Sequence, residues 1–260
     1  LGKSLSLGLS LFSSLLATLI ITTNQEAAFG APPAGIKPDP PTTKVRTIEL
    51  KSWLQGHCYI SFDKNNLRME SPERDVVLLL KAPEWKAICY NPRLKLIFIG
   101  DAKAYVPDDV KTAGWMRPSS PTELIPTSFS KVTFEGMKCT VYKLTSHQKF
   151  KVNNDRTWQR LLLREGTYTV TEFKSYPETA VKALERAMGM PPVGGVPVKM
   201  IVVNNGNESK DELKVLSVSM RPVGPDHFAV PKNFKRVKTQ PELRGTVGSD
   251  KEVFEMMRVE

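Results

Sequence analysis

Short runs of alternating apolar and polar residues fill the first half of this chain, between residues 45 and 100. Such alternation is typical of half-buried β-strands, because successive side chains of a strand point to opposite faces. Turn residues such as those at 63–66 and 91–93 separate the runs. The pattern predicts a meandering antiparallel sheet with strands at residues 47–54, 57–63, 66–70, 76–81, 85–90 and 94–99.

The run at 76–80 is apolar at every position, so this strand is expected in the middle of the sheet with material packed on both faces. Residues 137–144 resume strand character. Residues 198–203 and 213–220 flank a polar loop and predict a hairpin. The interval from 101 to 126 is richer in proline and charge, and it fits a short helix or a covering loop.

The clearest predicted helix spans residues 175–189. Ser175 and Glu178 form an S-x-x-E capping pattern, and Gly189 is placed to end the helix. Its apolar positions recur on one face, as expected of a helix that packs on a sheet. Residues 155–164 fit a second helix or a strand.

The first thirty residues predict a secretory signal peptide. Lys3 precedes an apolar run at 5–22, and Ala28 and Gly30 supply small residues before a cleavage point after residue 30. The alternative is a retained membrane anchor, since about eighteen apolar residues can span a bilayer. The expected organisation is therefore a signal peptide at 1–30, a proline-rich linker at 31–44, a single domain at 45–240 and a C-terminal tail at 241–260. We expect an exported protein of the periplasm, the extracellular space or the cell envelope.

The formal net charge of +10 at pH 7 predicts attraction to anionic surfaces. An exported chain meets membrane headgroups or acidic wall polymers, so nucleic acid is not an expected partner. One short segment concentrates positive charge around Phe234 and Val237, and it either contacts an anionic surface or forms a solvated face. Its cations are Lys232, Lys235, Arg236 and Lys238.

The sequence holds few residues in patterns that carry chemistry. The histidines are His57, His147 and His227, and none of them stands in a metal-binding pair or beside a nucleophile motif. The three cysteines, Cys58, Cys89 and Cys139, lack metal-ligand spacing. A disulfide between Cys89 and Cys139 is geometrically conceivable, and the alternative is three buried thiols. We expect a protein that is not an enzyme and uses no metal or cofactor.

Several short motifs resemble the LolA-like lipoprotein-carrier superfamily. They comprise the paired early strands from Tyr59–Ser61 to Asn66–Glu70, the sequence Ala82–Lys86 leading to Tyr90–Pro92, Gly195–Val198 after a helix, and the closing Phe228–Phe234. The resemblance spans about residues 46 to 238. It implies an α+β, mainly β fold in which a curved antiparallel sheet, or half-barrel, packs on one or two helices around an apolar cavity.

That architecture predicts a carrier or binding protein that holds a lipid, an acyl chain or a lipoprotein by burial. The expected cavity lining consists of apolar strand residues, namely Leu67, Met69, Val77, Leu79, Ile97, Ile99, Leu216, Val218 and Met220. The alternative is a cell-envelope interaction protein whose sheet is filled and whose basic surface binds an acidic polymer or a protein partner. A cavity of several hundred cubic ångströms would favour the carrier, and a packed concave face would favour the alternative.

Overall fold

The computed structural model describes residues 42–107, 110, 119–146, 156–172 and 176–245. All of them lie in one unit of the chain, Pro40–Glu260. The predicted signal peptide at 1–30, the proline-rich linker at 31–44 up to residue 41, and His147 lie outside the described residues.

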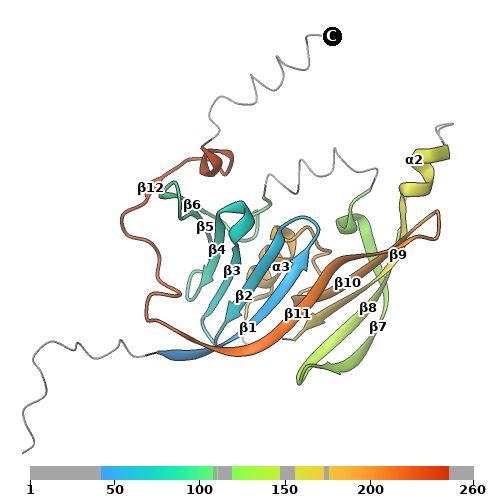
Figure 1. The fold of residues 1–260 in the computed structure, drawn as a ribbon, viewed down its shortest axis with the longest axis horizontal. Helices are drawn as coiled ribbons and strands as arrows, with labels where there is room; N and C mark the ends of the chain where they lie inside the picture. The colour runs from blue at the N-terminus through green and yellow to red at the C-terminus, as the bar shows by residue number, and fades with distance from the viewer. Residues whose placement is uncertain (1–41, 108–109, 111–118, 147–155, 173–175, 246–260) are drawn as a thin grey trace, which may run out of the picture. The chain divides into compact units, whose positions relative to one another are not determined.

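One twelve-stranded sheet dominates the described part of the chain, in the order β12-β6-β5-β4-β3-β2-β1-β11-β10-β9-β8-β7 (Figure 1). Every neighbouring pair is antiparallel except β12 and β6, which are parallel. The strands are β1 (Thr43–Ser52), β2 (Gly56–Phe62), β3 (Asn66–Ser71), β4 (Val76–Lys81), β5 (Lys86–Asn91), β6 (Leu96–Gly100), β7 (Leu124–Phe134), β8 (Met137–Ser146), β9 (Leu163–Thr171), β10 (Val196–Asn204), β11 (Ser209–Val223) and β12 (Lys235–Arg236).

Two helices and three short 3₁₀ turns complete these elements in the described residues. Their bounds are α2 (Arg156–Leu161), α3 (Glu178–Ala187), η1 (Pro72–Arg74), η2 (Pro121–Glu123) and η3 (Pro241–Arg244). The predicted fold class, a mainly β α+β protein with an antiparallel sheet on a helix, is therefore confirmed. The range 155–164, predicted as a helix or a strand, contains both. Helix α2 ends at Leu161, and strand β9 begins at Leu163.

The sheet curves around α3. This helix contacts both β5 and β10, which stand third and ninth in the strand order. Neighbouring strands lie about 4.8 Å apart, and a helix with its side chains is only about 10 Å wide. A flat sheet could not bring both strands to one helix, so the strands bend and enclose α3 on their inner face (Figure 1).

Strand β4 is buried on both faces, as its apolar run predicts. Leu78 and Leu80 join the main core against α3, whereas Val77 and Leu79 join a second cluster on the outer face. That second cluster is covered by apolar residues of the C-terminal segment, namely Phe228, Val230 and Phe234. The segment then pairs with β6 as β12 and continues to Leu243, which is 3% exposed and belongs to the main core.

Helix α3 begins after Pro177 and ends at Ala187, within the predicted range. Gly189 follows the last turn of the helix and has a φ of +68°. Glycine adopts this left-handed conformation without strain. The predicted capping pattern of Ser175 and Glu178 is wrong, because the N-cap is Pro177, which makes no side-chain capping hydrogen bond, and Glu178 is the first residue of the helix. The apolar face of the helix is fully buried against the sheet, as expected.

All three cysteines are free thiols in the core, so the conceivable bridge between Cys89 and Cys139 does not form. Burial raises the pKa of the Cys58 thiol to about 12 and that of the Cys89 thiol to about 11. Protonated, inaccessible thiols are poor nucleophiles.

We therefore expect the folded protein to resist thiol titration. With Ellman's reagent at pH 8, no thiol should react within minutes in native buffer, and all three should react after unfolding in guanidinium. Fast reaction of any thiol in the folded protein would contradict its buried position.

Candidate functional site

The residues expected to line one cavity divide between two faces of the sheet. Leu67 and Met69 lie on the inner face, in the main core with α3. The second, outer cluster contains Val77, Leu79 and Ile97, and Ile99 packs against it. The physical reason is the period of two in a strand: Val77 and Leu78 are adjacent in sequence, so they point to opposite faces.

The three residues expected from β11 also separate. Val218 packs against the main core, while Leu216 is 48% exposed and Met220 is 54% exposed. The pairing of β1 with β11 shifts between Glu49 and Leu50, which leaves Leu216 as an extra residue of β11. Such a bulge breaks the alternation between Leu216 and Val218. Met220 follows Val218 with no further shift in register, so it lies on the same face as Val218 and is exposed.

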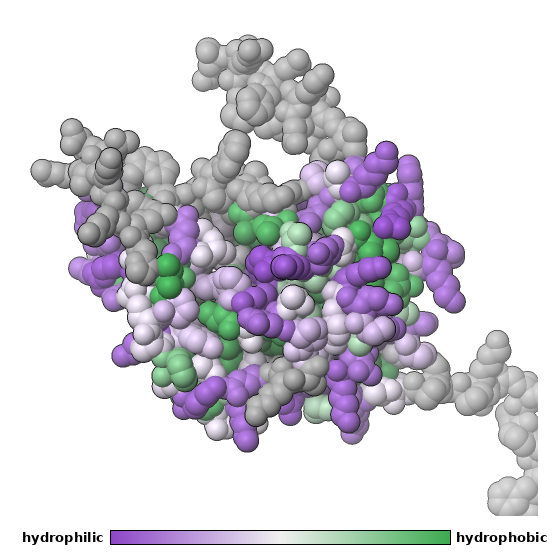
Figure 2. Space-filling model, turned by 180° about the vertical axis from the view of Figure 1, so that it is seen from behind, coloured by the Kyte–Doolittle hydropathy of each residue, from purple (hydrophilic) through white to green (hydrophobic). Residues whose placement is uncertain are grey.

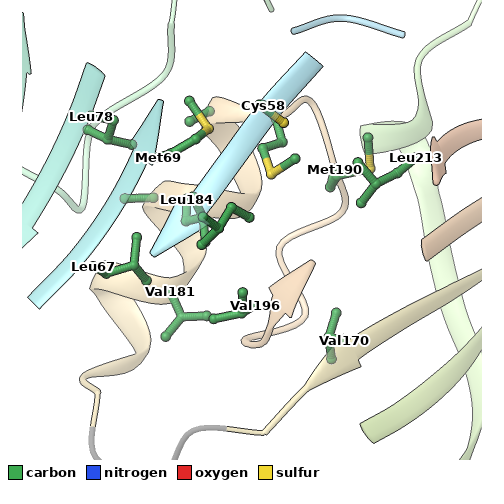
Figure 3. Close-up of a cluster of buried hydrophobic side chains, with 14 of the residues drawn as sticks. Cys58, Leu67, Met69, Leu78, Val170, Val181, Leu184, Met190, Val196 and Leu213 are labelled. Carbon is green, nitrogen blue, oxygen red and sulfur yellow. The ribbon is translucent and has the colours of Figure 1, made fainter. Parts of the chain in front are cut away.

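The inner face is filled where α3 covers it. Figure 3 shows Val181 and Leu184 projecting from α3 among Leu67, Met69 and Val196. A cavity of about 40 Å³ remains beside Met69 and Ala187, and another of about 20 Å³ remains beside Met188. Spaces of this size hold a water molecule or two, and an acyl chain needs a volume of several hundred cubic ångströms.

A larger hollow, of about 370 Å³, lies on the outer face of the strands β8, β9 and β10. Two cross-strand ladders of side chains form it. In one of them, Lys143, Thr167 and Ile201 stand side by side. Thr145, Glu165 and Val203 form the other. The hollow is completed by Thr127, Leu144 and Gly166.

Gly166 lets the strands approach closely at the centre of this hollow. A Cβ atom there would lie 2.7 Å from the carbonyl oxygen of Ile201, which is closer than real contacts allow. Beside the hollow, the edge strand β7 carries Ile125, which pairs with Thr145 and is 43% exposed. The lining therefore combines the apolar side chains of Ile201 and Val203 on β10 with threonines, one lysine and one glutamate on β7, β8 and β9.

A second open hollow, of about 260 Å³, lies where β1 and β3 meet the chain after β11. It is lined by Val45, Asn66 and Phe228 among others, and it includes Asp63 and Lys81. This lining is more polar than that of the first hollow, so it is less suited to a hydrocarbon chain. Figure 2 shows apolar side chains in several separate groups between polar ones on the face turned away in Figure 1.

The basic C-terminal segment is held in place by its apolar residues. Phe234 packs on the outer cluster, with its ring centroid 5.6 Å from that of Tyr90, and Val237 is 8% exposed in the main core. The four predicted contact residues are all exposed: Lys232, Lys235, Arg236 and Lys238.

A polar cluster on the outer face of β1, β2 and β11 was not predicted. The Glu49 carboxylate lies 2.8 Å from His57 Nε2 and accepts a hydrogen bond of 2.7 Å from the Ser217 hydroxyl. These two hydrogen bonds lower the pKa of Glu49. The cluster holds a serine, a histidine and a carboxylate, but the carboxylate stands between the other two. In a nucleophilic triad the histidine must contact the hydroxyl, so this arrangement does not activate Ser217.

Among the described residues, the carboxyl group with the largest stated shift is that of Glu185, which α3 carries into the core at 0% exposure. Its oxygens accept hydrogen bonds from the backbone N–H groups of Gly194 and Gly195, at 2.8 and 3.2 Å, and from the Tyr168 hydroxyl at 3.3 Å. Burial raises the pKa of Glu185 to about 8, although these donors oppose the rise. The carboxyl group joins α3 to the loop before β10. Sequence reasoning missed it because its position on the apolar stripe carries no motif.

No cluster of histidine, cysteine, aspartate and glutamate suited to a metal ion occurs among the described residues. None of the helices in the described ranges is both long and apolar enough to span a bilayer.

Comparisons with known proteins find similar solved structures but no matching family model. No protein-family model matches the sequence, and a search of curated proteins found no match. Three similar solved structures cover about three quarters of this chain. The first is an uncharacterized conserved protein from Thermus thermophilus, at 8% identity and a TM-score of 0.31, with 75% of this chain and 90% of that chain covered.

The second is a LolA superfamily protein from Nitrosomonas europaea, at 10% identity and a TM-score of 0.24, with 74% and 91% covered. The third is a Vibrio parahaemolyticus domain named as a candidate outer membrane lipoprotein-sorting protein, at 10% identity and a TM-score of 0.19, with 73% and 86% covered. The LolA-like superfamily is thus represented among the structures similar to this chain.

Proposed function

We propose that this protein is an exported, non-catalytic binding protein of the periplasm or cell envelope that holds an acyl chain of a lipid or lipoprotein. The observation that carries the proposal is the hollow of about 370 Å³ across β8, β9 and β10. Its volume falls in the range of small-molecule sites, and Ile201 and Val203 give it an apolar side along β10. Because α3 fills the inner face, the proposed ligand binds on an open part of the outer face.

Burial of hydrocarbon supplies the binding energy in this proposal. Each methylene removed from water contributes about 0.8 kcal/mol, and association itself costs several kcal/mol. A chain of about ten carbons along the two ladders would leave a useful net affinity. The rim suits a lipid headgroup, because Thr145 and Thr167 offer hydroxyl groups and Lys143 offers a positive charge.

The test makes the apolar β10 side of the hollow polar without disturbing strand propensity. In the double variant Ile201→Thr/Val203→Thr, we expect a fluorescent fatty-acid probe to bind roughly tenfold more weakly, because two partly buried apolar side chains gain hydroxyl groups. The control is Val132→Thr/Val141→Thr, which exchanges two valines for threonine on β7 and β8 outside the hollow and should leave probe binding unchanged.

Probe titration would be combined with native mass spectrometry of the protein purified from its own envelope. Co-purifying lipid that is lost in the Ile201→Thr/Val203→Thr variant would support the proposal. Failure of the unaltered protein to bind the probe, with no lipid in the mass spectrum, would overturn it.

The second candidate is a cell-envelope interaction protein that binds an acidic polymer or a protein partner. It is favoured by the filled inner face around Leu184 and by the exposed cations of the C-terminal segment. Absence of bound lipid together with retention on an acidic wall polymer would select this candidate over the acyl carrier.

A further inference from the structure

The edge of the sheet at β12 combines positive charges from two segments that are far apart in the sequence. The backbone N–H of Lys235 donates a hydrogen bond of 2.8 Å to the carbonyl oxygen of Lys95, and β12 runs parallel to β6 from there. The turn before β6 contributes Arg93 and Lys95, both exposed, beside the four exposed cations of the C-terminal segment. In the sequence, only the four cations of the C-terminal segment stand close together.

These cations sit on a rigid support. Phe234 and Val237 anchor the segment on opposite sides of the β6 edge, one in the outer cluster and one in the main core. The backbone hydrogen bonds of β12 fix the residues between them. Binding therefore requires little ordering of the backbone, which is a main cost of association for a flexible basic tail.

Few acids neutralise this edge in the described part of the chain. Arg93 pairs with Asp75 at 2.7 Å. Hydrogen bonds from Thr239 lower the pKa of Glu242, and the charge of Lys238 adds to this effect. No ion pair within the described ranges involves Lys232, Lys235 or Arg236. The net charge of the edge is therefore positive.

The edge also presents one apolar side chain among its charges. Leu94, at the tip of the turn between Arg93 and Lys95, is 36% exposed. A leucine in this position gains nothing from a polyanion dissolved in water, whereas it can leave water at the boundary between lipid headgroups and acyl chains. The combination of cations around an exposed leucine favours a lipid surface over a soluble acidic polymer.

We propose that this edge, formed by residues 93–95 and 232–238, docks the protein on the surface of a bilayer that contains anionic phospholipid. Lysine and arginine attract the phosphate groups, and Leu94 enters the headgroup boundary. The docking goes beyond the proposed acyl binding and does not depend on the hollow across β8–β10.

The test is co-sedimentation of the full chain with vesicles of phosphatidylglycerol and phosphatidylcholine mixed at roughly 1:3, compared with pure phosphatidylcholine vesicles. Neutralising Lys232, Lys235, Arg236 and Lys238 to glutamine should weaken binding to the mixed vesicles roughly 100-fold. The matched control neutralises four exposed lysines elsewhere, Lys51, Lys138, Lys199 and Lys214, and has the same formal charge. Binding of this control should stay within about threefold of the unaltered protein.

Three outcomes would overturn the proposal. They are equal loss in both variants, equal binding to the two kinds of vesicle, and binding to soluble polyglutamate with no binding to vesicles. The Ile201→Thr/Val203→Thr variant separates the two functions, because it should lose the fatty-acid probe and keep vesicle binding.

Discussion

Replacing Glu185 by glutamine is expected to remove a loss of stability that the protein undergoes as the pH rises from 5 to 8. The pKa of this carboxyl group is about 8 in the folded state and near 4.5 when it is exposed on unfolding. Between these values the folded chain keeps a proton that the unfolded chain releases. The contribution of Glu185 is fully present below pH 4.5 and is lost as the pH approaches 8, at up to about 1.4 kcal/mol per pH unit.

Urea unfolding at pH 5, 6, 7, 8 and 9 measures this effect. The difference in unfolding free energy between the unaltered protein and Glu185→Gln should shrink as the pH rises, by roughly 4 kcal/mol over the whole range. His227 has the opposite effect on stability. Burial lowers its pKa, so its contribution to the unfolding free energy increases as the pH rises toward 6.5. Taking the difference between two proteins that both keep His227 cancels that contribution.

The control for this experiment is Glu178→Gln, on the same helix. Glu178 is exposed, and the hydrogen bond from Lys182 lowers its pKa, so it is ionised in both states above pH 5. Its replacement should leave the pH profile between 5 and 8 unchanged. A difference between the unaltered protein and Glu185→Gln that is constant with pH would show that Glu185 is already ionised in the core.

Shortening Leu184 to alanine should destabilise the protein by about 2 to 5 kcal/mol. Leu184 is 0% exposed and lies at the centre of the inner face, where α3 meets strands from both ends of the sheet. Removal of its methyl groups leaves a cavity that surrounding strands cannot easily close, because their hydrogen bonds fix their spacing.

Denaturant unfolding at constant pH measures this loss. Thr179→Ala provides the control, since it changes an exposed residue of the same helix and should alter stability by less than about 0.5 kcal/mol. If Leu184→Ala were equally mild, α3 would not be the element that fills the curved sheet.

The strands in the first half of the chain could be predicted because each one shows its own alternation of apolar and polar residues or its own apolar run. The limits of β4 match the prediction at residues 76–81, and its burial on both faces follows from an uninterrupted apolar run. The hairpin of β10 and β11 was visible for the same reason, as was helix α3.

Strand β7 was missed because its residues carry little pattern. Positions 125–133 are exposed on both faces, so no alternation marks the strand, and its pairing with β8 is what makes it extended. The two-residue strand β12 was missed for a related reason, since it exists only through hydrogen bonds to the distant turn at Lys95.

The sequence by itself determined the strand-rich character of this protein, helix α3, and the exposed cations flanking Phe234, because alternation, the apolar stripe of a helix and charge are local properties. Only the tertiary structure decided which apolar residues share a face. A bulge at Leu216 shifts the alternation, and the C-terminal segment covers the outer cluster at Val77. The hollow at Ile201 and the buried carboxyl of Glu185 likewise depend on which strands and loops become neighbours. Such contacts join residues far apart in the chain, and local pattern carries no information about them.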